Sequence, residues 1–285
     1  MGFIYQWQDV SISLDRMNEI HTQQNEEDEN RHIATLSDGD CGIRIQNLCF
    51  KYDGARPDYV LNNINLTIPQ NKVTAIVGAS GSGKTTLIKL LLGFYNSNEG
   101  NIYVGKDNLS EFSLSWWRSQ CGAVMQEGYL FSDTIARNIA VSDDEIDLKR
   151  LRHAARVANI ADYIEELPLG YNTKIGQDGQ GISQGQRQRI LIARVVYKNP
   201  RIVLLDEATN SLDANNEKAI VENLSGFYKG KTVVVVAHRL STVKNADQIV
   251  VLDGGRIVET GSHADLTRGK GKYYELVRNQ LELGN

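Results

Sequence analysis

A run of nine residues, 78–86, combines the groups that proteins use to bind a chain of phosphates. It fits the P-loop pattern G-x-x-x-x-G-K-[ST] and follows the apolar residues 73–77. Its glycines can adopt backbone angles that other residues avoid, so that consecutive N–H groups point into one concavity. The alternative is a glycine-rich turn that only joins a strand to a helix. The complete pattern at a strand-to-helix junction favours the phosphate site.

Each part of this run has a role in binding a nucleoside triphosphate with Mg²⁺. A strand is expected to end at Val77 and a helix to begin near Lys84, and the helix N-terminus adds partial positive charge. Lys84 can reach the β- and γ-phosphates and so assist catalysis, and the hydroxyl of Thr85 can ligate Mg²⁺. The predicted nucleotide-binding residues of the run are Gly78, Ser80, Gly81, Ser82, Gly83, Lys84, Thr85 and Thr86.

Two acidic residues end a second apolar strand pattern, at 202–205. Asp206 at such a strand end suits a buried Mg²⁺ ligand, directly or through water. The adjacent Glu207 can polarise the water that attacks the γ-phosphate. On its own the pair could be two surface acids at a strand end. Beside a complete P-loop it predicts hydrolysis of a nucleoside triphosphate.

Composition excludes several other classes of function. The 285 residues carry 31 Lys and Arg against 35 Asp and Glu, a net charge of −4, which argues against a general nucleic-acid binder. Three cysteines without a C-x-x-C pair are too few for a disulfide framework and fit a reducing compartment. Apolar runs are too short for a transmembrane helix, and the N-terminus lacks the basic start of a signal peptide, so we expect this stretch to be soluble.

Strand and helix patterns alternate around both candidate sites. The strand patterns at 73–77 and 201–205 are followed by helical patterns at 85–94 and 214–228. Such units predict an α/β fold with a largely parallel sheet and with ligands at the carboxyl ends of its strands. Further strands are expected at 43–50, 64–68, 100–105, 123–125, 232–237 and on both sides of the Gly254-Gly255 turn. Further helices are expected over 135–167, 187–197 and 272–283, with a loop at 170–186.

The first forty residues differ in character from the rest. Within 1–20, apolar residues recur at spacings of four and three, as on one stripe of an amphipathic helix. These residues are Phe3, Trp7, Val10, Leu14 and Met17. The stripe should pack on its own domain, on a second copy, or on a segment outside this sequence. Residues 21–41 are polar and acidic and are expected to form a linker to a globular domain over 42–285.

Together these motifs resemble the nucleotide-binding domain of ABC-type ATPases, and more closely that of ABC exporters. The resemblance covers residues from about 43 to 282 and rests on several motifs in order. Residues 181–189 are similar to the signature sequence of that family, and 173–179 to the exporter X-loop. Four more motifs match: Tyr52 for the aromatic that stacks on adenine, Gln126 for the Q-loop, Ser211-Leu212-Asp213 for the D-loop and His238 for the H-loop.

The resemblance implies a fold and an assembly. The fold is that of a P-loop NTPase with a mostly parallel central sheet, an antiparallel β subdomain and a helical subdomain at about 127–197. The assembly is a head-to-tail homodimer in which each ATP lies between the P-loop of one chain and the signature of its partner. A single chain would then carry two incomplete half-sites.

The roles of single residues also follow from the resemblance. Ser183 and the backbone of Gly185 would hold the γ-phosphate of the partner's ATP. Gln126 would sense Mg²⁺ and the membrane domains, and His238 would contact the γ-phosphate and help to position the catalytic Glu207. Gln186 and Asp213 belong to the same nucleotide-binding set. Taken singly, each match also has a structural interpretation, such as a strand-end histidine, a packed aromatic or a loop residue.

One position departs from the family pattern. The usual L-S-G-G-Q is here Ile182-Ser183-Gln184-Gly185-Gln186, with Gln184 where the first glycine is expected. The serine and the glycine that contact phosphate in the family are present. We therefore expect an active site, while the effect of Gln184 on its rate is open.

The N-terminal stretch narrows the resemblance further. An amphipathic segment followed by an acidic linker is similar to the end of the last transmembrane helix and the tether of exporters. Half-transporters whose N-terminal peptidase processes double-glycine peptides, such as bacteriocins, have similar stretches. This implies peptide export at the cytoplasmic face of the inner membrane, with membrane domains that handle the peptide and lie outside this sequence.

Two other functions are left open. One is a soluble ABC ATPase that acts on nucleic acid or ribosomes, which usually has two linked cassettes or a long coiled-coil insertion, and the sequence has neither. The other is a regulatory module that closes on ATP with little turnover, an alternative that Gln184 keeps open.

Overall fold

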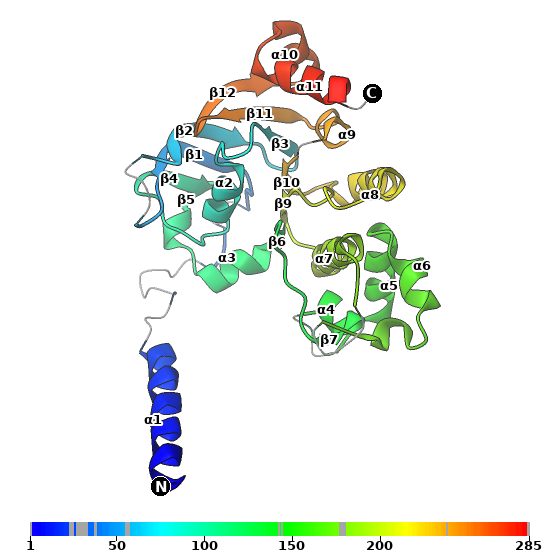
Figure 1. Cartoon of the computed structure of the whole chain (residues 1–285). Helices are drawn as coiled ribbons and strands as arrows, with labels where there is room; N and C mark the ends of the chain where they lie inside the picture. Colours follow the sequence, from blue (N-terminus) through cyan, green and yellow to red (C-terminus); the bar gives the residue numbers. More distant parts are fainter. Residues whose placement is uncertain are drawn as a thin grey trace.

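Six strands drawn from residues 73–261 form one central sheet in the computed structural model (Figure 1). Their order is β12-β11-β3-β10-β9-β6, and all neighbours are parallel except β11 and β12. The strands are β3 (Val73–Val77), β6 (Cys121–Val124), β9 (Ile202–Asp206), β10 (Thr232–Val236), β11 (Gln248–Asp253) and β12 (Arg256–Gly261). The predicted α/β fold with a mostly parallel central sheet is confirmed.

The register of this sheet brings the two halves of the predicted site to one edge. Val236 in β10 pairs with Asp206 in β9 and with Ile76 in β3. The P-loop leaves β3 one residue later, after Val77, and the acidic pair lies at the end of β9. Because all three strands are parallel, their carboxyl ends lie side by side, where ligands bind in open α/β sheets.

A second sheet is antiparallel and packs over one face of the first. Its order is β2-β1-β4-β5, with β1 (Ile43–Phe50), β2 (Leu61–Ile68), β4 (Glu99–Val104) and β5 (Asp107–Asn108). Between the two sheets, Ile45 and Ile64 share a buried cluster with Leu87 of α2 (Lys84–Leu91) and Leu204 of β9. The P-loop helix is therefore fixed by apolar contacts on both sides. The predicted antiparallel subdomain is confirmed.

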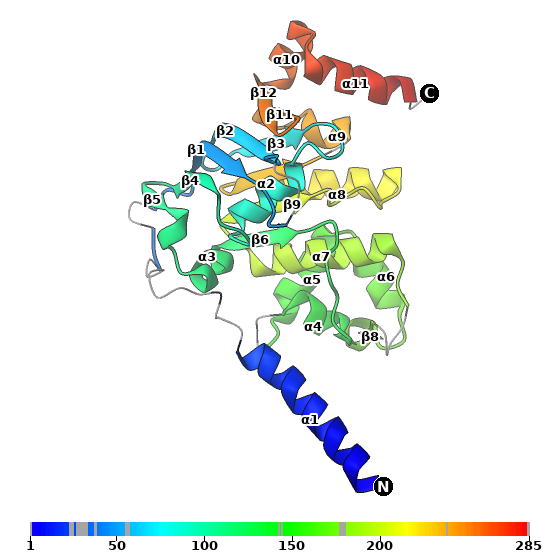
Figure 2. The ribbon, with the colours of Figure 1, turned by 60° about the vertical axis from the view of Figure 1, so that its left-hand side comes forward.

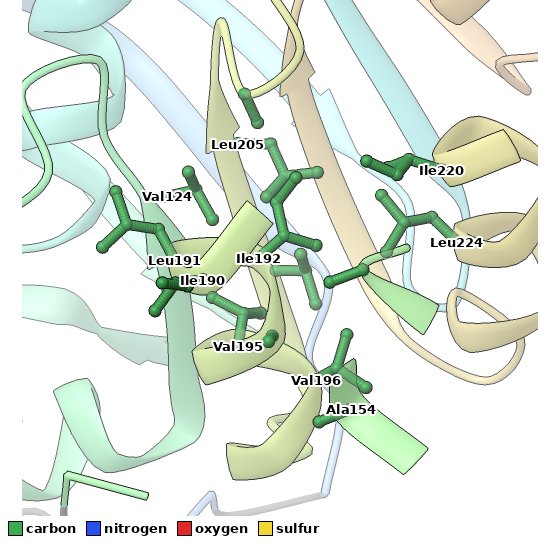
Figure 3. Close-up of a cluster of buried hydrophobic side chains, with 14 of the residues drawn as sticks. Val124, Ala154, Ile190, Leu191, Ile192, Val195, Val196, Leu205, Ile220 and Leu224 are labelled. Atoms are coloured by element: carbon green, nitrogen blue, oxygen red, sulfur yellow. The ribbon is translucent and has the colours of Figure 1, made fainter. Parts of the chain in front are cut away.

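Helices cover the other face of the central sheet. In Figure 3, Ile192 and Val195 of α7 (Gln184–Lys198) lie in one buried cluster with Val124 and Leu205 of the sheet. Helices α4 (Ile135–Ile139), α5 (Leu148–Val157) and α6 (Ala161–Glu166) lie beyond α7 (Figure 1). The predicted helical stretch at 135–167 is thus three helices, because Asp147 caps the start of α5 by accepting from two backbone N–H groups.

The remaining elements connect and extend these layers. They are η1 (Leu109–Glu111), α3 (Leu114–Gln120), β7 (Asp133–Thr134), η2 (Gly170–Asn172), β8 (Lys174–Ile175), α8 (Ala214–Phe227), α9 (Leu240–Val243), α10 (His263–Gly269) and α11 (Lys272–Leu283). The structure describes residues 2–22, 26, 34–36, 39–54, 58–141, 143, 145–176, 181–237 and 239–283. Residues 177–179 of the expected X-loop and His238 lie outside the described residues.

Helix α1 (Gly2–His21) extends away from the rest of the chain, as the two views in Figure 1 and Figure 2 agree. Three of its predicted stripe residues, Val10, Leu14 and Met17, are about half exposed, at 49–55%. The described part of the stripe therefore does not pack on the globular domain of the same chain. Among the described residues, no helix combines the length and the apolar character needed to cross a membrane.

Candidate active site

The loop between β3 and α2 needs glycine at two positions because other parts of the chain approach it closely. A Cβ on Gly78 would collide with the carbonyl oxygen of Leu252. Gly83, with φ +101°, caps α2, and a Cβ there would lie 2.6 Å from Cδ2 of Leu61. Gly83 offers no side chain, and no other described side chain caps the helix, so its first N–H groups stay available to an anion.

The side chain of Lys84 folds back into this loop. It is buried, and its Nζ donates hydrogen bonds to the carbonyls of Gly78 at 3.0 Å and Ala79 at 2.8 Å. Burial lowers the pKa of Lys84, and the carboxylates of Glu207 and Asp206 act in the opposite direction. The ammonium group is thus held beside the loop backbone, in the field of both predicted acids.

Asp206 has the character of a cation ligand. It is fully buried, and within the described residues neither carboxylate oxygen has a hydrogen-bond partner of ordinary geometry. Burial raises the pKa of Asp206, while the nearby Thr85 hydroxyl and, more weakly, Lys84 lower it. The hydroxyl of Ser82 is also buried and unpaired among the described residues. The buried carboxylate of Asp206 and the hydroxyls of Thr85 and Ser82 fit Mg²⁺ with phosphate oxygens as further ligands.

Glu207 has an unusual backbone conformation. Its φ is +52°, a left-handed value that side chains other than glycine and asparagine seldom adopt. Its N–H donates to the carbonyl of Val236 at 3.1 Å, and its Oε2 accepts a hydrogen bond from the side chain of Asn210 at 2.6 Å. The carboxylate therefore has a defined position at the end of β9, beside the end of β10.

Tyr52 lies beside the P-loop helix. Its hydroxyl shares a hydrogen bond of 3.0 Å with the hydroxyl of Thr86. Its ring is perpendicular to those of Phe50 and Tyr95, with centroids 4.9 and 5.3 Å away. The ring is half-buried. The structure thus brings Tyr52 to the P-loop, where a ring face beside a phosphate site can stack on a nucleotide base.

The signature segment forms the start of α7. Ser183 caps the helix, because its hydroxyl accepts from the N–H of Gln186 while the Gln186 side chain accepts from the N–H of Ser183. Gln184 is the exposed first residue of the helix. A Cβ on Gly185 would come within 3.2 Å of the carbonyl oxygen of Ser211, so the signature lies against the D-loop of the same chain.

The other predicted site residues differ in their position and in the contacts that they already make. Gln126 is exposed just after β6. Asp213 caps α8 by accepting from the N–H of Asn216 at 3.0 Å, so its carboxylate already has a structural role. His238 lies outside the described residues. The structure therefore brings together Lys84 and the two acids, and places the signature on a separate helix.

Two residues that no sequence motif indicated also lie at this site. Asn210 donates to Glu207, and Arg239 forms an ion pair with Glu217 and donates to the D-loop backbone. A spacing of three residues between Glu207 and Asn210, in a segment that must turn from strand to helix, is a signal that could have indicated the first contact. No sequence signal indicated the second.

The fold and this site define a class of protein. A P-loop between a buried parallel strand and a helix, with a buried aspartate at the end of another parallel strand of the same sheet, is the arrangement of P-loop nucleoside triphosphatases.

Comparison with known proteins identifies the family. Residues 61–210, more than half of the chain, match the family described as ABC transporter. The exotoxin translocation ATP-binding protein PaxB of Pasteurella aerogenes is 42% identical over 280 residues, which cover 97% of this chain and 39% of the relative. The leukotoxin translocation ATP-binding protein LktB of Mannheimia haemolytica has the same identity and coverage.

A solved structure agrees with the sequence relatives. It is described as a bacterial Atm1-family ABC exporter with ATP bound, with a TM-score of 0.86 and 36% identity, over 96% of this chain and 47% of that one. The chain therefore belongs to the ABC transporter family and holds the ATP-binding domain of the exporter kind. It spans about two fifths of the length of the curated relatives. These matches favour the exporter interpretation over a soluble non-transport ATPase or a binding module with little turnover.

Proposed function

We propose that this domain hydrolyses ATP with Mg²⁺ and powers the export of a peptide or protein across a membrane. The observation that carries the proposal is the meeting of the P-loop, Lys84, Asp206 and Glu207 at one edge of the central sheet. Lys84 and the free N–H groups of α2 would bind the phosphates. Glu207 would accept the proton of the attacking water.

Three residues would hold Mg²⁺: Thr85, Asp206 and Gln126. When bound, Mg²⁺ neutralises phosphate charge as a Lewis acid. The described residues hold no cluster of three or more acids, histidines or cysteines, so the phosphates would complete the ligand set. His238, directly after the strand next to Glu207, would contact the γ-phosphate. The ring of Tyr52 would stack on the base.

The active unit would be a homodimer. Side chains of α2 and α7 belong to buried clusters on opposite faces of the central sheet, so the sheet lies between the two helices of one chain. The start of α7, with Ser183, Gly185 and Gln186, would therefore face the P-loop of a second copy, and Asp213 would lie at the same junction. A helix N-terminus with a hydroxyl suits an anion.

The transported molecule is inferred from the relatives. PaxB and LktB are described as exotoxin and leukotoxin translocation proteins, which favours a peptide or protein, bacteriocin-like peptides included, handled by membrane domains. The exposed apolar face of α1 is consistent with a continuation toward such membrane domains. The domain would then work at the cytoplasmic face of the cell membrane, without nucleic acid as a partner.

Steady-state hydrolysis of Mg-ATP over a wide range of chain concentrations tests this function. Sites shared between copies predict that specific activity rises with concentration until the chain is dimeric. Glu207→Gln serves as the matched control, because it should bind ATP, accumulate as a dimer on sizing, and lose turnover by more than about 100-fold. Full turnover of this variant would remove Glu207 from the role of base, and tight ATP binding without any parental turnover would favour a switch.

A further inference from the structure

The turn that follows β9 contains a contact that the nucleotide motifs do not account for. The side-chain amide of Asn210 donates to Oε2 of Glu207 at 2.6 Å, and the backbone N–H of Asn210 donates to the Glu207 carbonyl at 3.2 Å. A hydrogen bond to an ionised acceptor is about twice as strong as one between neutral groups. Asn210 therefore fixes one oxygen of the carboxylate and limits its rotation.

Arg239 holds the same turn from outside. Its guanidinium pairs with Glu217 on α8, whose side chain is only 7% exposed. The other nitrogen, Nη2, lies 3.5 Å from the carbonyl of Asn210 and 3.4 Å from that of Leu212. A buried carboxylate needs a cationic partner, so this ion pair anchors the guanidinium, and the guanidinium anchors the D-loop backbone.

On one side, the turn after β9 faces a cavity and has few packing contacts. Glu207, Asn210 and Arg239 all line a cavity of about 290 Å³ that extends under α8. Side chains that line a cavity of this size face space that water can occupy, so other side chains restrict them less on that side. Glu207 must also be kept at φ +52°, which the chain adopts only when its surroundings enforce it. The polar contacts of Asn210 and Arg239 supply that enforcement together with the hydrogen bond from the Glu207 N–H to Val236.

We propose that Asn210 is a positioning residue for ATP hydrolysis, which directs the carboxylate of Glu207, and that the Arg239–Glu217 ion pair supports it by fixing the turn. With one oxygen held by the amide, the carboxylate keeps a fixed orientation toward the attacking water. This inference rests on the proposed role of Glu207 as the base. It assigns no contact with ATP to either Asn210 or Arg239.

Asn210→Ala in the full 285-residue chain tests the first part. We expect kcat to fall about 10-fold, the value of one hydrogen bond to a charged group, with KM for Mg-ATP unchanged within about 2-fold. Asn210→Asp has nearly the same shape but places a second carboxylate at this distance, so it should lose more activity than Asn210→Ala. Asn210→Gln keeps the donor and should recover part of the rate.

A double-mutant cycle separates positioning from simple damage to the fold. In the Glu207→Gln background there is no carboxylate left to position, so adding Asn210→Ala should leave the residual rate unchanged. Equal losses in both backgrounds would overturn the proposal, and so would parental kcat in Asn210→Ala. If Glu207→Gln itself keeps the parental rate, the proposed function of Glu207 fails instead, so the two failures can be told apart.

The ion pair is tested by removing both charges together. Arg239→Met with Glu217→Gln leaves no unpaired buried charge, so the double variant should fold, as its thermal unfolding will show. We expect a lower kcat with unchanged ATP binding, because the turn loses the guanidinium donors. Parental kcat in the folded double variant would exclude the supporting role of the pair, and Ser225→Ala, on the α8 wall of the same cavity, is the matched control.

Discussion

Burial opposes the charge on two of the residues that define this site. It lowers the pKa of Lys84 and raises the pKa of Asp206, and each residue partly offsets the shift of the other. Asp206 lies at the end of a buried strand, where the Thr85 hydroxyl and the charge of Lys84 offset only part of the effect of its burial. In the absence of a bound cation, its negative charge should therefore destabilise the folded chain.

Asp206→Asn should reveal this cost. The ordinary pKa of Asp is 3.8, and the folded value is higher, so the folded chain holds the proton more tightly than the unfolded chain. The folded chain then loses stability as the pH rises from 3.8 through the raised pKa of Asp206. Above that pKa the loss is complete. At pH 8 and without nucleotide, the variant should be more stable by about 1 kcal/mol, and its advantage should shrink as the pH falls toward 4.

Thermal unfolding at several pH values, with and without Mg-ATP, measures both effects. Mg-ATP should stabilise the parent chain but have a smaller effect on Asp206→Asn, because the proposed Mg²⁺ ligand is gone. Asp247→Asn is a control of opposite sign, since that exposed carboxylate is paired with Lys72, accepts from the N–H of Val73 and has a lowered pKa, so this variant should lose stability at pH 8. Equal stability of Asp206→Asn and the parent at pH 8 would contradict the unpaired buried charge.

Among single residues, the sequence predicted the positions of those that belong to short local motifs. Lys84 and Asp206 belong to short motifs next to apolar strands, and both are where the patterns placed them. Asn210 and Arg239 could not be found in this way, because Arg239 reaches the D-loop from a segment about 30 residues further along the chain. Only the pairing of β9 with β10 brings these segments together.

Elements were predicted best where apolar periodicity is strong, as in the strands β3, β9 and β10. The start of α7 was predicted at residue 187, but the helix begins at Gln184. The polar residues of its first turn hide the period, while the S-x-x-Q spacing of Ser183 and Gln186 is a capping-box signal that could have corrected the prediction. Helix α10 was missed because Leu266 is its only buried residue.

The N-terminal serine caps of α7 and α10 can be compared by the same substitution. The hydroxyl of Ser183 accepts from the N–H of Gln186 at 3.2 Å, and that of Ser262, the cap of α10, accepts from the N–H of Asp265 at 3.2 Å. Ser183→Ala and Ser262→Ala should each lower the free energy of unfolding by about 1 kcal/mol. Only Ser183→Ala should also reduce ATP hydrolysis at saturating chain concentration, since only that helix is proposed to face a nucleotide.

Urea unfolding gives the free energies and a coupled phosphate assay gives the rates. Parental activity in both variants would mean that the start of α7 acts only as a helix terminus. Loss of activity in both would mean that the rate follows stability alone, and the proposed contact with the nucleotide would then lose its support.

At the scale of the whole molecule, the central sheet separates the two helices that the proposal brings to one nucleotide. Helix α2 packs with the antiparallel sheet on one face, and α7 packs with α4 and α5 on the other. The sequence predicted this fold from alternating strands and helices. The outward position of α1 could not be predicted, because an apolar stripe shows only that a partner surface is needed, and the stripe fits three different partners equally well.

Mixing two inactive variants tests whether the sites are shared between copies. Lys84→Met removes the phosphate-binding ammonium, and Ser183→Glu places a negative charge where the partner's γ-phosphate is proposed to bind, so each variant alone should be inactive. In a mixed dimer, the P-loop of the Ser183→Glu chain faces the intact signature of the Lys84→Met chain, which rebuilds one complete site. If copies assort randomly, an equal mixture should regain about a quarter of the parental rate. A site built within a single chain would regain nothing, because every chain in the mixture carries one of the two defects.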